Sequence, residues 1–179
     1  MEPARKQKVV YLGNLSPVAL RLAASPGVEL VACVFEAEDE VEEIMERLRG
    51  CEFFFVRSDR DLGESLRRLG PLDLGVIGNF GLILSKDTLA IPRVGFVNLH
   101  LGLLPAYPGR HPIRNALARG EPLVGVTLHR ATTVPDAGPV LDLGAIAAGK
   151  LSPDAVFERL SRLAAEILAR NLPALIAGH

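Results

Sequence analysis

The feature that most constrains the fold is a regular alternation of short apolar runs with segments of helical spacing. Five runs rich in apolar and β-branched residues predict strands at 8–12, 28–35, 52–56, 72–77 and 95–99. Apolar residues recurring every three or four positions predict helices between them, at 17–24, 37–49, 58–69 and 86–90. Strands alternating with helices favour a doubly wound parallel sheet. We therefore expect an α/β fold, a Rossmann-like, mostly parallel twisted sheet with helices on both faces.

The last third of the chain departs from this alternation. Its pattern predicts a helix at about 112–119, followed by two strands of a possible hairpin at 123–130 and 140–147. A final helix is expected to start at Ser152-Pro153, with proline at its first position, and to end at Pro173. No linker, repeat or low-complexity tract divides the 179 residues, so residues 1–179 are expected to form a single domain.

Composition excludes several classes of function. A net charge of −1 provides no broad basic field, so no nucleic-acid partner is expected. No apolar stretch approaches the roughly 20 residues of a membrane span, and residues 1–8 lack the apolar region of a signal peptide. Cys33 and Cys51 fit buried free thiols in a reducing compartment. We expect a cytoplasmic protein with no membrane partner, and the oligomeric state stays open.

The residues that can do chemistry lie between Gly95 and Val140. Asn98 and His100 alternate with apolar residues at the end of the fifth predicted strand, where side chains two apart share a face. In open α/β sheets, ligands bind at the carboxyl ends of the strands. Asp136 follows in a loop closed by Gly138-Pro139. An amide donor, an imidazole and a carboxylate together can stabilise an oxyanion and relay a proton during attack on an acyl carbon.

These residues, in this order, resemble the motif of the folate-dependent formyltransferases. The matching pieces are Asn98-Leu99-His100, Leu103-Leu104-Pro105, Gly109 and Asp136-Ala137-Gly138. Asn79 to Leu84, followed by Ile91-Pro92, looks like the pterin-binding segment of that family. The resemblance covers roughly residues 8 to 175. It implies transfer of a formyl group from the co-substrate 10-formyltetrahydrofolate to a primary amine. We expect no metal, because four scattered histidines and two distant cysteines form no ligand cluster.

The resemblance also implies roles for individual residues. Asn98 would donate an amide N–H to the oxyanion, His100 would support the oxyanion or take the amine proton, and Asp136 would orient His100. The expected pterin contacts are Phe80, Gly81, Leu82, Ile83, Leu84, Val97, Thr132, Thr133, Val134 and Pro135. Val134 and Pro135 stand where the family usually has acidic residues and a glycine. Because valine rarely adopts positive φ and proline fixes its own φ, we expect a stiffer loop of different backbone. Gly102 replaces a serine that is common in the motif.

Four residues are candidate contacts for the acceptor. Gly13 and Asn14 follow the first predicted strand, where a phosphate could bind at a helix N-terminus, although Pro17 removes one backbone N–H there. Arg110 and His111 lie beyond the catalytic histidine, and Arg110 is the expected contact for an anionic group of the acceptor.

The preferred hypothesis is an N-formyltransferase acting on a small acceptor of the amino-sugar or aminoacyl type. Glycinamide ribonucleotide, the acceptor in purine synthesis, is the alternative, and it fits the chain length but not the first turn. Methionyl-tRNA is not expected, because the chain ends soon after its last helix and carries a slightly negative net charge. A formyltetrahydrofolate hydrolase and a non-catalytic folate-binding module are further alternatives. An oxidoreductase is disfavoured, since no G-x-G-x-x-G follows the first strand.

Overall fold

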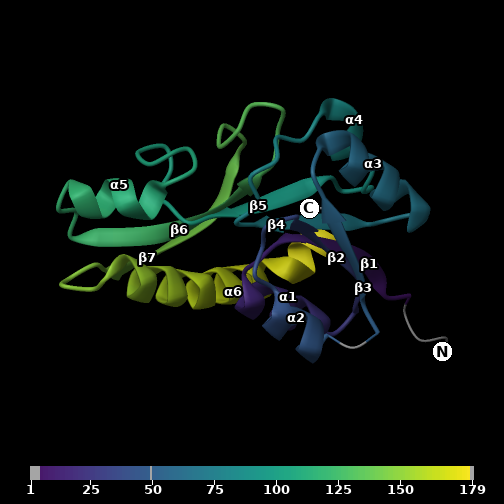
Figure 1. Ribbon diagram of the computed structural model, residues 1–179, viewed down its shortest axis with the longest axis horizontal. Helices are drawn as coiled ribbons and strands as arrows, with labels where there is room; N and C mark the ends of the chain where they lie inside the picture. Colours follow the sequence, from purple (N-terminus) through teal and green to yellow (C-terminus); the bar gives the residue numbers. More distant parts are fainter. Residues whose placement is uncertain (1–4, 49, 178–179) are drawn as a thin grey trace.

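The computed structural model describes residues 5–48 and 50–177, which form one seven-stranded sheet flanked by helices (Figure 1). The strands are β1 (Gln7–Gly13), β2 (Val28–Glu36), β3 (Glu52–Val56), β4 (Leu74–Gly78), β5 (Phe96–His100), β6 (Leu123–Arg130) and β7 (Val140–Ala147). Across the sheet they run β3-β2-β1-β4-β5-β6-β7. Strands β1 to β5 pair in parallel, whereas β6 and β7 pair antiparallel. The predicted α/β fold and the predicted hairpin are both confirmed.

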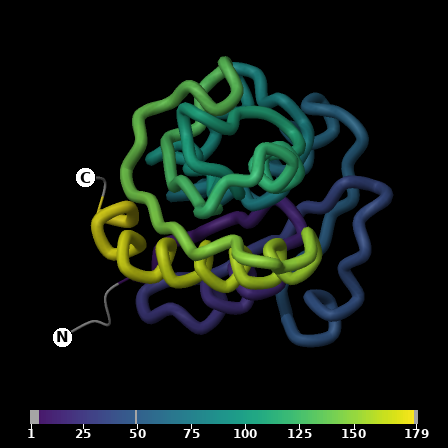
Figure 2. Tube along the Cα trace, turned by 90° about the vertical axis from the view of Figure 1, so that its left-hand side faces the viewer, coloured from purple at the N-terminus to yellow at the C-terminus, as the bar shows by residue number. Residues whose placement is uncertain are grey.

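Helices cover both faces of the sheet. They are α1 (Ser16–Ala23), α2 (Glu42–Arg47), α3 (Asp59–Arg68), α4 (Lys86–Leu89), α5 (Pro112–Ala118) and α6 (Pro153–Ala177). Apolar side chains of α1, α2 and α6 share one cluster with the sheet, and those of α3 and α4 share the cluster on the opposite face. Figure 2 shows the long α6, in yellow, running beside the purple N-terminal segments. This cover explains why β1 and β4 are apolar on both faces.

The sheet has a topological switch point between β1 and β4, because the chain adds strands on one side of β1 and then on the other. Gly13, at the end of β1, has a φ of 121°, and a Cβ added there would lie 1.9 Å from the carbonyl oxygen of Gly78. Only glycine therefore lets these two strand ends approach each other. Strand β5 lies next to β4, so its carboxyl end borders the crevice expected at such a switch point.

The second helix is shorter than predicted. It begins at Glu42 instead of residue 37, and its predicted end at Arg49 lies outside the described residues. The cause is Asp39, whose carboxylate accepts hydrogen bonds from the Glu36 N–H at 2.8 Å and from the Asn14 amide at 2.9 Å. These bonds hold residues 37–41 out of the helix, since aspartate competes well for nearby backbone donors.

The last helix is longer than predicted. Pro173 does not end α6, which continues to Ala177. Proline removes one hydrogen bond inside a helix, but Leu172 and Leu175 on either side of it are buried in the core. Their burial offsets that loss and keeps the last turn helical.

Candidate active site

The end of β5 carries the two polar side chains expected there. Asn98 is half-buried, and His100 is buried with 7% of its surface exposed. Strand β6 pairs antiparallel with β5, so that Asn98 lies directly opposite His129 and His100 opposite Thr127. Directly opposed residues of an antiparallel pair share a face of the sheet. The strand register therefore brings a second histidine to the site.

His100 lies between a backbone carbonyl and a carboxylate. Its Nε2 lies 2.6 Å from the carbonyl oxygen of Tyr107, and its Nδ1 lies 3.4 Å from Oδ1 of Asp136. A carbonyl only accepts hydrogen bonds, so Nε2 carries a hydrogen, while Nδ1 faces the carboxylate at ion-pair distance. Gly102 makes room for this arrangement, because a Cβ there would lie 2.8 Å from both His100 Nε2 and the Tyr107 oxygen. The replacement of the usual serine thus has a steric reason.

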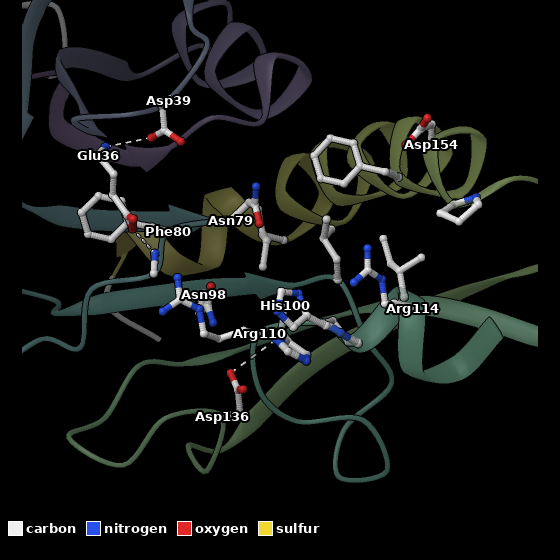
Figure 3. A pocket seen from close by; sticks show the side chains of 18 residues that line it. Glu36, Asp39, Asn79, Phe80, Asn98, His100, Arg110, Arg114, Asp136 and Asp154 are labelled. Carbon is white, nitrogen blue, oxygen red and sulfur yellow. Dashed lines mark hydrogen bonds and ion pairs between the residues drawn. The ribbon is translucent and has the colours of Figure 1, made fainter. Parts of the chain in front are cut away.

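Asp136 connects the loop after β6 to this histidine. Its Oδ2 accepts the backbone N–H of Gly109 at 2.7 Å, and its Oδ1 lies toward His100 (Figure 3). Burial alone would raise the pKa of the Asp136 carboxyl, but the Gly109 N–H and the charge of His100 hold that pKa below its ordinary value. The site therefore keeps an ionised carboxylate beside the imidazole.

The unusual backbone in this loop is at Asp136, whereas the sequence led us to expect it at Val134 and Pro135. Among the described residues other than glycine, only Asn79 and Asp136 have positive φ, at 57° and 55°. Val134 and Pro135 need no such backbone. Gly138 closes the loop, because a Cβ there would lie 1.8 Å from the carbonyl oxygen of Arg130. Left-handed backbone at a residue other than glycine costs about 1–3 kcal/mol and is concentrated at functional sites.

His129 is the site residue that the sequence did not indicate. It is 2% exposed, its Nε2 lies 3.1 Å from the Asn98 side-chain nitrogen, and its Nδ1 lies 3.0 Å from the carbonyl oxygen of Arg130. Its Nε2 also lies 3.7 Å from Oδ1 of Asp136, which is beyond hydrogen-bond length. The sequence signal for this position is weak. Thr127 and His129 are two apart on a predicted strand, but their place beside the site depends on the pairing of β6 with β5.

The predicted catalytic residues line a pocket of about 500 Å³. Its lining residues are Glu36, Asp39, Asn79, Phe80, Gly81, Asn98, Leu99, His100, Leu101, Arg110, His111, Pro112, Ile113, Arg114, Asp136, Pro153, Asp154 and Phe157. Figure 3 shows Glu36 and Asp39 toward one end and Arg114 toward the other, with Asn98 and His100 between them. The pocket thus brings together both acidic and basic groups around the candidate catalytic centre.

The predicted pterin segments lie partly outside this pocket. Phe80 and Gly81 line it, whereas the residues from 82 to 84 and from 132 to 135 do not. Ala131 packs in the same apolar cluster as Leu82 and Leu84, so the two predicted segments are neighbours. Ile83 and Val134 are 65% and 61% exposed, unusually high for large apolar side chains. Val97 is fully buried, and its side chain packs in the cluster that contains α1 and α6.

The two predicted phosphate contacts do not line the pocket. The backbone of Gly13 packs against the end of β4. The amide of Asn14 donates to Asp39 at 2.9 Å and accepts from the Asn79 amide at 2.7 Å. Burial and the nearby charge of Glu36 raise the pKa of Asp39 above its ordinary value, against the hydrogen bonds it accepts. Two carboxyl groups thus border the first turn.

Three basic side chains of the pocket are available to bind a ligand. The side chains of Arg110, His111 and Arg114 line the pocket and make no hydrogen bond or ion pair with the described residues. Arg110 and Glu36 both approach Gly81, since a Cβ there would lie 3.1 Å from Arg110 Nη2 and 2.9 Å from Glu36 Oε1. The Gly81 N–H donates to Glu36, so one predicted pterin donor is already occupied.

Within the described ranges, no group of three or more histidine, cysteine, aspartate or glutamate side chains could hold a metal ion. Over the same part of the chain, no helix combines the length and apolar character that crossing a membrane requires.

Comparison with known proteins identifies the family. Residues 36–172 match the family described as Formyl transferase. Fold and site together define a member of this group-transfer class, and the chain belongs to the formyl transferase family. The resemblance noted from the motifs is thereby confirmed.

Sequence relatives include two proteins named methionyl-tRNA formyltransferase. The one from Halorhodospira halophila is 40% identical over 119 residues, which cover 64% of this chain and 37% of the relative. The one from Herpetosiphon aurantiacus is 32% identical over 191 residues, covering 96% and 61% respectively. The chain thus spans about 37% to 61% of the length of these two relatives.

Solved structures confirm the fold. Glycinamide ribonucleotide transformylase 1 from Symbiobacterium toebii has a TM-score of 0.83 at 19% identity, with 98% of this chain and 90% of that chain covered. A formyltetrahydrofolate deformylase from Pseudomonas syringae has a TM-score of 0.79 at 22% identity, covering 97% and 62%. At such identities the likeness is one of fold, and the acceptor must be argued from the site.

Proposed function

We propose that this chain transfers a formyl group from 10-formyltetrahydrofolate to the primary amine of an acceptor that carries an anionic group. The observation that carries the proposal is the convergence of Asn98, His100 and Asp136 at one pocket, with Asp136 Oδ1 3.4 Å from His100 Nδ1. Membership of the family supports the choice of reaction.

The reaction needs a stabilised oxyanion and a route for one proton. The acceptor amine attacks the formyl carbon, the carbonyl electrons move to oxygen, and the new ammonium must lose a proton before the folate nitrogen leaves with one. Asn98 donates an N–H to the oxyanion, and the ring of His100, when protonated beside Asp136, adds positive charge near it. Asp136, kept ionised, orients this ring and accepts the ammonium proton, which then passes to the leaving nitrogen.

The co-substrate would bind between the two predicted pterin segments. Ile83 and Val134 offer exposed apolar side chains from two neighbouring loops, as a flat ring system requires. The donors and acceptors would come from the backbone of residues 80–84 and 131–136, with Gly81 reaching the pterin only if Glu36 releases its N–H. A cytoplasmic location accords with the free thiols of Cys33 and Cys51.

The acceptor's anionic group would bind at Arg110 and Arg114 instead of the first turn. The carboxylates of Glu36 and Asp39 border that turn and would repel a phosphate. This favours a small aminoacyl or amino-sugar acceptor over glycinamide ribonucleotide. The names of the sequence relatives make an aminoacyl group carried on tRNA the second candidate acceptor.

One assay tests both the reaction and the acceptor. Tetrahydrofolate release from 10-formyltetrahydrofolate is followed with no amine, with glycinamide ribonucleotide, with an amino-sugar nucleotide and with methionyl-tRNA. We expect release only with an amine, and fastest with an acceptor other than glycinamide ribonucleotide. Release without any amine would indicate a hydrolase, and absence of folate binding would refute the proposal.

Arg110→Ala separates the acceptor site from the catalytic site. We expect it to raise the Michaelis constant for the acceptor about tenfold, the scale of one lost charge-assisted contact, and to leave the constant for the folate unchanged. Arg162→Ala, on the exposed surface of α6, is the matched control. An unchanged acceptor constant in Arg110→Ala would remove this arginine from the acceptor site.

A further inference from the structure

The side chain of His129 has two hydrogen-bonding neighbours of different kinds. The carbonyl oxygen of Arg130, 3.0 Å from Nδ1, can only accept a hydrogen bond. In the neutral ring, Nδ1 therefore carries the hydrogen, and Nε2 is left with a lone pair. The group that faces Nε2 at 3.1 Å is the side-chain amide of Asn98. A lone pair there requires Asn98 to present its NH2 group, because its oxygen would be repelled.

This pairing decides which way the Asn98 amide faces. One N–H of the NH2 group is used on His129, and the second is left for the pocket that Asn98 lines. A flipped amide would aim its oxygen at the lone pair of Nε2 and lose the hydrogen bond. The competing contact of Nε2 is Asp136 Oδ1, but at 3.7 Å it is too long to be a hydrogen bond. The 3.1 Å contact therefore governs the state of the ring.

We propose that His129, as its neutral Nδ1–H tautomer, is a positioning residue that fixes the Asn98 amide with an N–H directed at the formyl oxygen. The inference rests on the proposed function for the role of Asn98, whereas the tautomer rests on the placement of the Asn98 amide nitrogen 3.1 Å from Nε2 and of the Arg130 carbonyl 3.0 Å from Nδ1. His129 is 2% exposed and does not line the pocket, so it acts through Asn98 without touching the substrates.

Two substitutions separate positioning from bulk structure. His129→Gln places a side-chain oxygen about where Nε2 lies and retains an acceptor for Asn98, whereas His129→Leu fills similar space without one. We expect His129→Leu to lower kcat about tenfold or more with little change in either Michaelis constant. We expect His129→Gln to keep kcat within about threefold of the parent. Equal losses in the two variants would overturn the proposal.

A double-mutant cycle tests whether the effect passes through Asn98. Asn98→Ala should cost about a hundredfold in kcat, the scale of one lost oxyanion donor. Adding His129→Leu to Asn98→Ala should then cost almost nothing further, because the group that His129 positions is gone. Multiplicative losses would mean that His129 acts independently of Asn98 and would overturn the proposal.

A spectroscopic readout separates failure of this proposal from failure of the proposed function. In a ¹⁵N–¹H correlation spectrum of the full chain with labelled histidine, the signals missing from His129→Gln identify the His129 ring. The expected pattern is a protonated Nδ1 and an unprotonated Nε2. An Nε2–H tautomer or a doubly protonated ring at neutral pH would refute the proposal whatever the activity. If the tautomer is as expected but no amine is formylated, the proposed function fails and the geometry stands.

Discussion

Replacing Asp136 by asparagine removes one charge from the site and little else. Asparagine has almost the same shape, and its side-chain oxygen can still accept the Gly109 N–H that now lies 2.7 Å from Oδ2. What is lost is the attraction between the carboxylate and the His100 ring, whose Nδ1 lies 3.4 Å from Oδ1. The substitution therefore tests electrostatics with the backbone contact conserved.

The magnitude follows from that distance. Two unit charges 3.4 Å apart attract by about 5 kcal/mol at an effective dielectric constant of 20, and by about 1 kcal/mol at that of bulk water. Asp136 is half-buried, so the value lies between these limits. Since about 1.4 kcal/mol corresponds to a factor of ten, we expect Asp136→Asn to lower kcat at least about a hundredfold. His100→Ala should cost a similar factor through loss of the same charged group.

The assay is steady-state release of tetrahydrofolate in the presence of a saturating amine. Folate binding, measured separately by calorimetry, should weaken much less than kcat, because the carboxylate acts on the proton and the ring. Glu166→Gln, on the exposed face of α6, is the matched exchange of carboxylate for amide. Turnover within about threefold of the parent in a folded Asp136→Asn variant would refute the assignment of Asp136.

Three further predictions concern stability and the loop. Gly13→Ala should cost about 3 kcal/mol or more in urea unfolding, because its Cβ would lie 1.9 Å from a carbonyl oxygen and its φ of 121° disfavours other residues. The Arg170 guanidinium lowers the pKa of Asp142 to about 2 through hydrogen bonds of 2.6 and 2.9 Å. After solvent screening, this pair should contribute about 1 kcal/mol to the free energy of unfolding. A lowered folded-state pKa means that this stability is present above the ordinary pKa of about 4 and is lost as pH falls toward 2, and Asp142→Asn should abolish that dependence. Pro135→Gly should lower the free energy of unfolding by about 0.4–1 kcal/mol by enlarging the freedom of the unfolded chain, and a gain in stability would contradict the proposed stiff loop.

The three candidate catalytic residues could be predicted on two different grounds. Asn98 and His100 are two apart on a strand, so a local rule places them on one face, whereas Asp136 was indicated by the order of the family motifs along the chain. His129 needed information that no local pattern holds, namely that β5 and β6 pair antiparallel with Asn98 opposite this residue. A histidine on an apolar strand is more often a satisfied core residue, and only the register makes it a neighbour of the site.

The acidic wall of the pocket was missed for a different reason. Residues 36–43 have the charge pattern of an exposed helix face, and acids near a helix N-terminus are favourable. A specific tertiary contact prevailed, because Asp39 bonds to the Glu36 N–H and to Asn14 on the neighbouring strand end. Whether Asp39 joins a helix or binds nearby donors depends on partners such as Asn14. Asn14 lies 25 residues away in the sequence, so no local pattern reveals the contact.

The strained backbone at Asp136 connects the proposed catalytic carboxylate with the proposed acceptor contact. Its left-handed φ of 55° persists only if the surroundings hold it, and the Gly109 N–H bonded to Oδ2 is one of the groups that do so. Gly109 itself has a φ of 89° and immediately precedes Arg110, the proposed contact for the acceptor's anionic group. An acceptor bound by Arg110 would therefore contact the residue next to Gly109, whose N–H holds the Asp136 carboxylate. Substitutions at Gly109 or Arg110 that change the preferred acceptor should also disturb the position of the carboxylate. We therefore expect them to change kcat as well as the Michaelis constant for the acceptor.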